Sequence, residues 1–185
     1  MMRALLLVTA LFLGASASAQ TPYPSDSVYQ LDATLTNSSG KTHGLDVYAG
    51  HPVLITMFYS SCKHTCPLLI ETVRAVARAA SNPQDLRVLM ISIDPERDTP
   101  ETLAKLAKER RIDTSRWSLV NANAADVRKI AAALGVQYKQ SPDGEFNHSS
   151  VISAINARGE ILKQSSTLGS ADPELTSAVL ARHSH

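Results

Sequence analysis

The 185-residue sequence lacks an excess of charge of either sign and lacks any run of basic residues. It has 18 Lys and Arg against 17 Asp and Glu, so the formal net charge at pH 7 is only +1. Binding to the phosphate backbone of DNA or RNA depends on clustered Lys and Arg. We therefore exclude nucleic acid as a partner.

The sequence also lacks an apolar run near its N-terminus that is long enough to cross a bilayer, which takes about 20 residues. The run there extends only from Ala4 to Leu13, after Arg3, and small residues ending in Ala-Ser-Ala at 17–19 follow it. This order is typical of a secretory signal peptide at residues 1–19. No cysteine follows the small residues, so we expect neither lipid attachment nor a stable membrane anchor. The protein is predicted to be periplasmic or otherwise exported, and soluble after cleavage.

Cysteine is scarce, since the chain has only Cys62 and Cys66. An oxidising compartment outside the cytoplasm would convert an idle pair of thiols into a disulfide. A purely structural disulfide is one interpretation, but closing so short a ring contributes only about 2 kcal/mol on the chain-entropy model. We therefore favour a functional pair.

The rest of the chain alternates between strand and helix patterns. After a polar segment at 20–27, residues 28–183 predict one α/β domain, which we expect to be monomeric. Its central sheet should be mixed but mostly parallel, with helices on both faces. The order is that of a thioredoxin-like fold with an added N-terminal β-hairpin. The expected strands are 28–35, 41–45, 53–58, 86–93, 117–120, 150–156 and 161–164, and the expected helices are 65–80, 99–110, 124–134 and 172–182.

The two cysteines lie at the junction between the strand at 53–58 and a helix that we expect to begin close to Cys66, because Pro67 is tolerated in the first turn of a helix. Positions i and i+4 lie on one helix face, so both sulfurs can reach one small object. The first helical turn carries free N–H groups and partial positive charge, and Lys63 adds a cation beside them. We expect this environment to lower the pKa of at least one thiol. Because a thiolate is both a metal ligand and a nucleophile, Cys62 and Cys66 are candidates for both roles.

His148 lies far along the chain, in a predicted loop just before the strand at 150–156. In a thioredoxin-like sheet that strand neighbours the one leading to the cysteines, so His148 is a candidate third ligand. A loop histidine is more often solvent-exposed, and only its combination with the cysteine pair favours a ligand. Two thiolates and one imidazole suit Cu(I), with Cu(II) and added oxygen or water ligands second. Structural zinc requires a fourth ligand, which His64 could supply only if its side chain turned toward the cysteine face.

Three stretches resemble the Sco/SenC family of copper proteins, which are linked to building the dinuclear copper centre of cytochrome c oxidase. They are Phe-Tyr-Ser-Ser-Cys-Lys-His-Thr-Cys-Pro at 58–67, Ser-Ile-Asp-Pro-Glu-Arg-Asp-Thr-Pro-Glu at 92–101, and His-Ser ahead of a strand ending in Asn-Ala-Arg-Gly at 156–159. The resemblance covers residues 29–180, in the same order and spacing. It implies a thioredoxin-like fold, a bound copper ion, and a ligand set of Cys62, Cys66 and His148.

The chain departs from the family in two respects. The family commonly has Pro directly after the first Cys, whereas this chain has Lys63 followed by His64. A positive residue there could hold the thiolate state or shift the protein toward redox work. The family also commonly has a membrane anchor or lipid attachment, and we expect neither in this chain. Docking to an oxidase is therefore left open. Asp94 and Asp98 follow a strand near the site, where we expect helix capping or loop ion pairs rather than metal contact.

Two functions remain open. One is a copper chaperone that receives copper from a donor protein and delivers it to a copper-accepting protein, such as a cytochrome c oxidase subunit or another exported cuproprotein. The other is a thiol–disulfide oxidoreductase using Cys62 and Cys66 as a redox pair. Two differences argue against the oxidoreductase. Thioredoxin-type enzymes have two residues between the cysteines, whereas this chain has three, and they have a Pro where this chain has His148 and Ser149. His183 and His185 belong to a terminal tail and receive no role.

Overall fold

The computed structural model describes residues 23–62, 65–80 and 85–180. Seven strands form one sheet in the order β2-β1-β5-β4-β3-β8-β9, and β6 and β7 pair separately. The strands are β1 (Leu35–Asn37), β2 (Thr42–His43), β3 (Val53–Phe58), β4 (Arg87–Ser92), β5 (Trp117–Ala122), β6 (Tyr138–Gln140), β7 (Phe146–His148), β8 (Ile152–Ile155) and β9 (Ile161–Ser165). The helices are α1 (Thr65–Ala79), α2 (Pro100–Glu109), α3 (Ala124–Ala133) and α4 (Pro173–Leu180), with 3-10 turns at Val28–Gln30 and Leu45–Tyr48.

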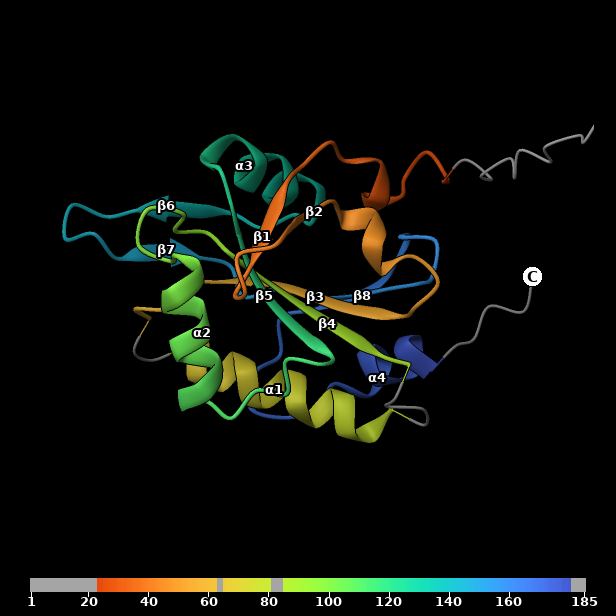
Figure 1. Cartoon of the computed structure of the whole chain (residues 1–185). Helices are drawn as coiled ribbons and strands as arrows, with labels where there is room; N and C mark the ends of the chain where they lie inside the picture. The colour runs from red at the N-terminus through yellow and green to blue at the C-terminus, as the bar shows by residue number, and fades with distance from the viewer. Residues whose placement is uncertain (1–22, 63–64, 81–84, 181–185) are drawn as a thin grey trace, which may run out of the picture.

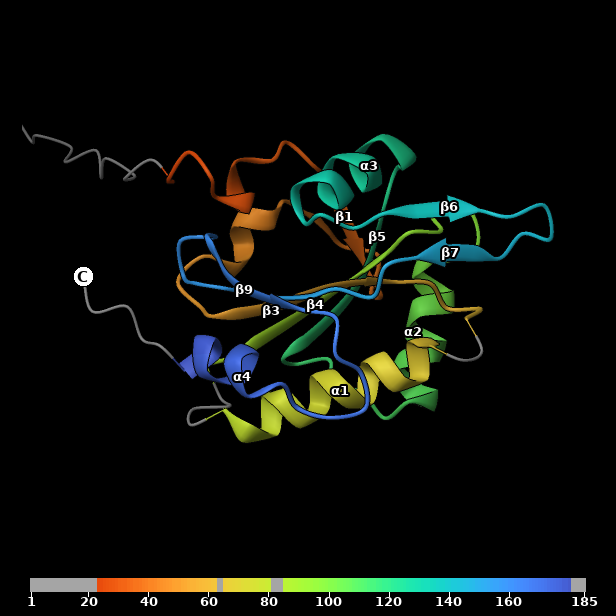
Figure 2. The same ribbon diagram turned by 180° about the vertical axis from the view of Figure 1, so that it is seen from behind.

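The centre of the sheet is parallel and its margins are antiparallel. β3, β4 and β5 run parallel, whereas β1 is antiparallel to β5 and β8 is antiparallel to β3. The helices α1, α2 and α4 cover one face and α3 covers the other (Figures 1 and 2). The prediction of a thioredoxin-like fold with a mixed central sheet flanked by helices is confirmed, and the parallel pairings lie at its centre, between β3, β4 and β5.

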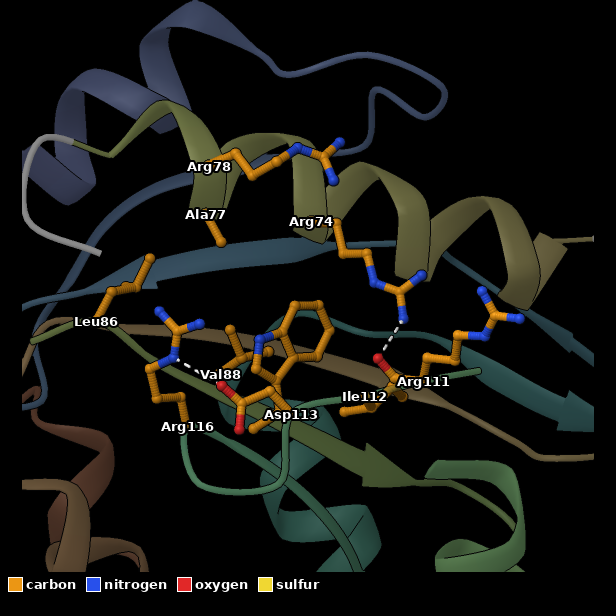
Figure 3. A pocket seen from close by; sticks show the side chains of 10 residues that line it. Arg74, Ala77, Arg78, Leu86, Val88, Arg111, Ile112, Asp113 and Arg116 are labelled. Atoms are coloured by element: carbon orange, nitrogen blue, oxygen red, sulfur yellow. Dashed lines mark hydrogen bonds and ion pairs between the residues drawn. The ribbon is translucent and has the colours of Figure 1, made fainter. Parts of the chain in front are cut away.

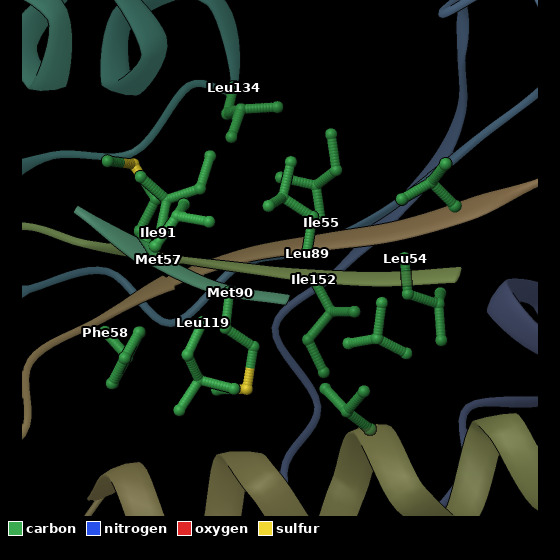
Figure 4. Packing of buried hydrophobic residues seen from close by; sticks show 14 of the residues in the cluster. Leu54, Ile55, Met57, Phe58, Leu89, Met90, Ile91, Leu119, Leu134 and Ile152 are labelled. Carbon is green, nitrogen blue, oxygen red and sulfur yellow. The ribbon is translucent and has the colours of Figure 1, made fainter. Parts of the chain in front are cut away.

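The core is built on both faces of β3, whose six residues are all buried. Because successive strand residues point to opposite faces, Ile55 and Met57 point to the same side as Leu134, whereas Leu54 and Phe58 point toward α1 (Figure 4). A strand buried on both faces reads as a continuous apolar run, which is why 53–58 could be located from the sequence.

The N-terminal hairpin is present, but its first strand is shorter than predicted. The prediction of a strand over 28–35 is wrong for its first part, because Val28–Gln30 forms a 3-10 turn. The Ser27 hydroxyl accepts a hydrogen bond from the Tyr29 N–H and caps this turn. The hairpin itself consists of β1 and β2, with Leu35 opposite His43.

A second hairpin was not predicted. β6 and β7 pair with Tyr138 opposite His148, so His148 ends a strand and does not lie in a loop as predicted. Strands of three mostly polar residues carry almost no alternation signal, which explains the omission. The hairpin projects from the end of the sheet at which β3 finishes (Figures 1 and 2).

Several predictions fall on residues outside the described ranges. These are the signal peptide at 1–19, the first part of the polar segment at 20–27, and the residues Lys63, His64, His183 and His185. Within the described part of the chain, no helix is both long enough and apolar enough to cross a membrane.

Candidate metal centre

The two cysteines lie where β3 gives way to α1. The Phe58 carbonyl accepts a hydrogen bond of 2.8 Å from the Ile93 N–H, which fixes the end of β3 beside the end of β4. The Cys62 N–H then donates to the Tyr59 carbonyl at 3.3 Å, and this turn brings Cys62 to the start of α1. Cys66 is the second residue of that helix. Its N–H donates to the Cys62 sulfur at 3.3 Å, so the structure brings the pair together without a disulfide between them.

The environments of the two thiols differ. Cys66 is buried, whereas Cys62 is partly exposed. Burial raises the pKa of the Cys66 thiol, and the nearby Cys62 side chain adds to the increase. The lowered pKa that was expected for at least one of the two thiols therefore does not apply to Cys66. The helix N-terminus instead supplies an N–H donor to Cys62, and such a donor stabilises negative charge on sulfur.

Tyr59 connects Cys62 with His148. Its hydroxyl donates to the Glu145 carboxylate at 3.0 Å, and the Cys62 side chain lies near enough to add to the increase in the pKa of Tyr59. Its ring meets the His148 ring edge to face, with centroids 5.7 Å apart. Burial, together with the Glu145 hydrogen bond, raises the pKa of Tyr59 and keeps it a neutral donor. The sequence interpretation gave Tyr59 no role. Its position three residues before Cys62 could have indicated that its side chain lies near the cysteines.

His148 presents one ring nitrogen for binding. Its Nδ1 lies 3.2 Å from the Ser149 carbonyl, and because a carbonyl only accepts, Nδ1 carries the proton. The lone pair is then on Nε2. Burial lowers the pKa of His148, which keeps the imidazole neutral. A neutral imidazole held through one nitrogen by a backbone carbonyl is the usual form of a metal-binding histidine.

The three predicted ligands do not form a closed cluster. Among the described residues, no three Cys, His, Asp or Glu side chains are close enough together to hold a metal ion. Cys62 and Cys66 are joined by a hydrogen bond, and the Tyr59 ring contacts the His148 ring. Two sulfurs and one imidazole nitrogen nevertheless have the chemistry that a soft ion of low coordination number prefers.

Asp98 anchors the loop that carries the cysteines. It is fully buried, and its carboxylate accepts hydrogen bonds from the Ser60 N–H at 3.0 Å, from the Ser60 hydroxyl, and from the Ser92 hydroxyl at 2.5 Å. The N-cap of α2 is Thr99 and not Asp98. Helix capping is therefore wrong for Asp98, which joins the loop after β3 to the end of β4.

Asp94 makes the loop ion pair that was predicted. Its carboxylate pairs with the Arg97 guanidinium. Arg97 also donates to the Gly144 carbonyl at 2.5 Å and lies over the Phe146 ring, 5.8 Å from its centroid. This chain of contacts attaches the β6–β7 hairpin, and with it His148, to the end of β4.

Comparison with known proteins identifies the family. The model of the SCO1/SenC family matches residues 23–182. The chain belongs to the SCO1/SenC family. The structure of BsSco, which is described as a member of the Sco family of cytochrome c oxidase assembly proteins, has a TM-score of 0.64 at 22% identity.

Individual relatives have diverged considerably from this Sco chain. The SCO1 protein homolog of Bacillus subtilis (strain 168) is 25% identical over 158 residues, which are 83% of this chain and 81% of that protein. The mitochondrial SCO1 homolog of Homo sapiens is 30% identical over 138 residues, which are 70% of this chain but 44% of that protein. The structure of Bradyrhizobium japonicum ScoI with copper bound has a TM-score of 0.64 at 24% identity, covering 80% of this chain and 92% of that one. This last likeness establishes the shared fold.

Proposed function

We propose that this Sco protein binds one copper ion through Cys62, Cys66 and His148 and delivers it to a copper centre of a respiratory oxidase or of another exported cuproprotein. Membership of the family supports this, as does the copper bound to the ScoI protein of Bradyrhizobium japonicum. The observation that carries the proposal is the pair of neighbouring cysteines at the start of α1, which are not joined in a disulfide and in which the Cys66 N–H donates to the Cys62 sulfur.

The same contacts indicate how the ligands would act. Cys62 is the partly exposed thiol, so it is the ligand that a donor or acceptor protein could reach first. Cys66 has to lose a proton from a buried position, and a cation beside its sulfur would offset that cost. Because the three groups do not form a cluster in the part of the chain that the structure describes, joint ligation requires them to come closer together.

The test is an anaerobic titration of the reduced protein with Cu(I) against a competing chelator. We expect one tight equivalent, its loss in Cys62→Ser, and an affinity at least about tenfold weaker in His148→Ala. His43→Ala is a matched control, because His43 likewise places Nδ1 on the carbonyl of the next residue and meets a tyrosine ring edge to face. Stoichiometric binding retained in Cys62→Ser would overturn the proposal, and an equal loss in His43→Ala would remove His148 from the ligand set.

A second candidate function rests on the asymmetry of the thiols. A partly exposed Cys62 beside a buried Cys66 is the arrangement of an attacking and a resolving thiol. In that reaction Cys62 and Cys66 become a disulfide while a partner disulfide becomes two thiols. Turnover of a protein disulfide by a chain that binds no copper, abolished in Cys62→Ser, would make this the main function.

A further inference from the structure

A cavity of about 420 Å3 lies at the end of α1 that is distant from the cysteines. Trp117, at the start of β5, forms part of its lining. Four arginines surround it: Arg74 and Arg78 come from α1, and Arg111 and Arg116 come from the segment between α2 and β5 (Figure 3). A volume of this size falls within the range of small-molecule sites, roughly 300–1,000 Å3.

One acidic side chain, Asp113, lines the cavity. Its carboxylate pairs with the Arg116 Nε at 3.0 Å. Hydrogen bonds from the Ser115 hydroxyl and from Arg116 lower the pKa of Asp113, so the carboxylate is ionised at neutral pH. Asp113 therefore compensates the charge of Arg116. It does not compensate the charges of the other three arginines that line the cavity.

Arg74 is held in place within the protein. It pairs with Glu71 at 2.5 Å and donates to the backbone carbonyls of Arg110 and Arg111. By contrast, the guanidinium groups of Arg78 and Arg111 make no hydrogen bond or ion pair with any residue that the structure describes. These two positive charges border one cavity without a carboxylate partner from that part of the chain, and like charges repel.

The backbone at Arg111 adds a second observation. Arg111 has φ of +51° and is the one non-glycine residue with positive φ among those described. It follows Arg110, the C-cap residue of α2. Its N–H donates to the Lys108 carbonyl at 3.1 Å, and the Ile112 N–H donates to the Ala107 carbonyl at 2.8 Å. This helix ending strongly favours glycine. A long cationic side chain therefore occupies a position at which glycine would be more stable.

We infer that this cavity is a binding site for a small molecule carrying two or more oxyanion groups, either phosphate or carboxylate. Guanidinium groups match both groups because the planar fork donates two parallel hydrogen bonds. Arg78 and Arg111 are free to make such bonds, Arg74 is positioned between them by its backbone contacts, and Trp117 offers an apolar surface. A ligand with two anionic groups would compensate the charges of Arg78 and Arg111 together.

The test is isothermal titration calorimetry of the reduced, copper-free protein with inorganic pyrophosphate and, separately, with citrate, which distinguishes phosphate from carboxylate recognition. We expect one saturable site per chain and a Kd about tenfold higher in Arg78→Ala and in Arg111→Gly. Arg111→Gly removes the cation while relieving the backbone, so weaker binding in that variant cannot be attributed to unfolding. Arg128→Ala is the matched control, since Arg128 is an exposed arginine on α3 away from the cavity.

Saturable binding of either anion, weakened in both cavity variants and unchanged in Arg128→Ala, would support the site. The absence of saturable binding for both anions would overturn it. An equal loss in Arg128→Ala would also overturn it, because the effect would then be one of overall charge. The measurement uses no copper and leaves the cysteines intact, so its outcome is independent of the copper function.

Discussion

At the residue scale, the two cysteines share one sequence pattern but differ chemically. Their i, i+4 spacing at a helix start could be read from the sequence, because both positions lie on one helix face. The burial of Cys66 could not, since it depends on the strands and helices that pack around the start of α1. The sequence therefore predicted a paired site but not which thiol is the reactive one.

We expect Cys62 to be alkylated at least about tenfold faster than Cys66 by iodoacetamide at pH 7.5. The reason is that the thiolate is the nucleophile, and burial raises the pKa of Cys66 while restricting access to it. The measurement is mass spectrometry of two single-cysteine variants, Cys66→Ser and Cys62→Ser, sampled over time. Denatured samples of each provide the control, in which the two rates should converge. Equal rates in the folded variants would contradict the assigned asymmetry.

At the scale of elements, the loop between β3 and α1 depends on a contact with the loop that follows β4. Asp98 is buried and accepts three hydrogen bonds, two from Ser60 and one from Ser92. Without its carboxylate, three donors near the cysteines would lose their acceptor. The geometry of the candidate metal centre is therefore set partly by a residue that the sequence interpretation placed nearby without identifying its partners.

We expect Asp98→Ala to lower the free energy of unfolding by about 3 kcal/mol, because a buried donor left unpaired costs about 1–3 kcal/mol. Urea unfolding at pH 7 measures this directly. Glu96→Ala is the control in the same loop, since Glu96 is exposed and its removal should change stability by less than about 0.5 kcal/mol. If the two variants lost the same stability, the anchoring role of Asp98 would be wrong.

Elements with a strong local signal were predictable, and those defined by distant contacts were not. The strand at 53–58 is a continuous apolar run, and Thr99 with Pro100 marks the start of α2. The 3-10 turn at Val28–Gln30 instead depends on Gly159, whose carbonyl accepts the Val28 N–H at 2.9 Å. Gly159 has φ of +84°, and a Cβ there would collide with the Ser27 side chain. Such a contact across the whole chain leaves no trace in the local pattern of residues 28–35.

At the scale of the whole molecule, the N-terminal segment is attached to α3 through Asp126. The Asp126 carboxylate accepts the Thr34 N–H at 3.1 Å, pairs with Lys129 at 2.7 Å, and accepts a hydrogen bond from the Asn123 side chain at 2.7 Å. It therefore joins residues 92 positions apart, where β1 meets the edge of the parallel strands. This attachment makes the stability of the fold depend on the ionisation of one carboxyl.

The Lys129 contact and the Thr34 N–H lower the pKa of Asp126 in the folded protein. A lowered folded pKa means that the stabilisation is complete above the unfolded value, about 3.9, and disappears as the pH falls through the folded value. We expect Asp126→Asn to cost about 1 kcal/mol at pH 7, with the difference from the unsubstituted protein shrinking below about pH 4. Urea unfolding across pH 3–7 measures it, with Asp26→Asn, an exposed carboxyl, as the control that should show no such convergence. A difference that stayed constant over this pH range would mean that Asp126 acts through shape alone and not through its charge.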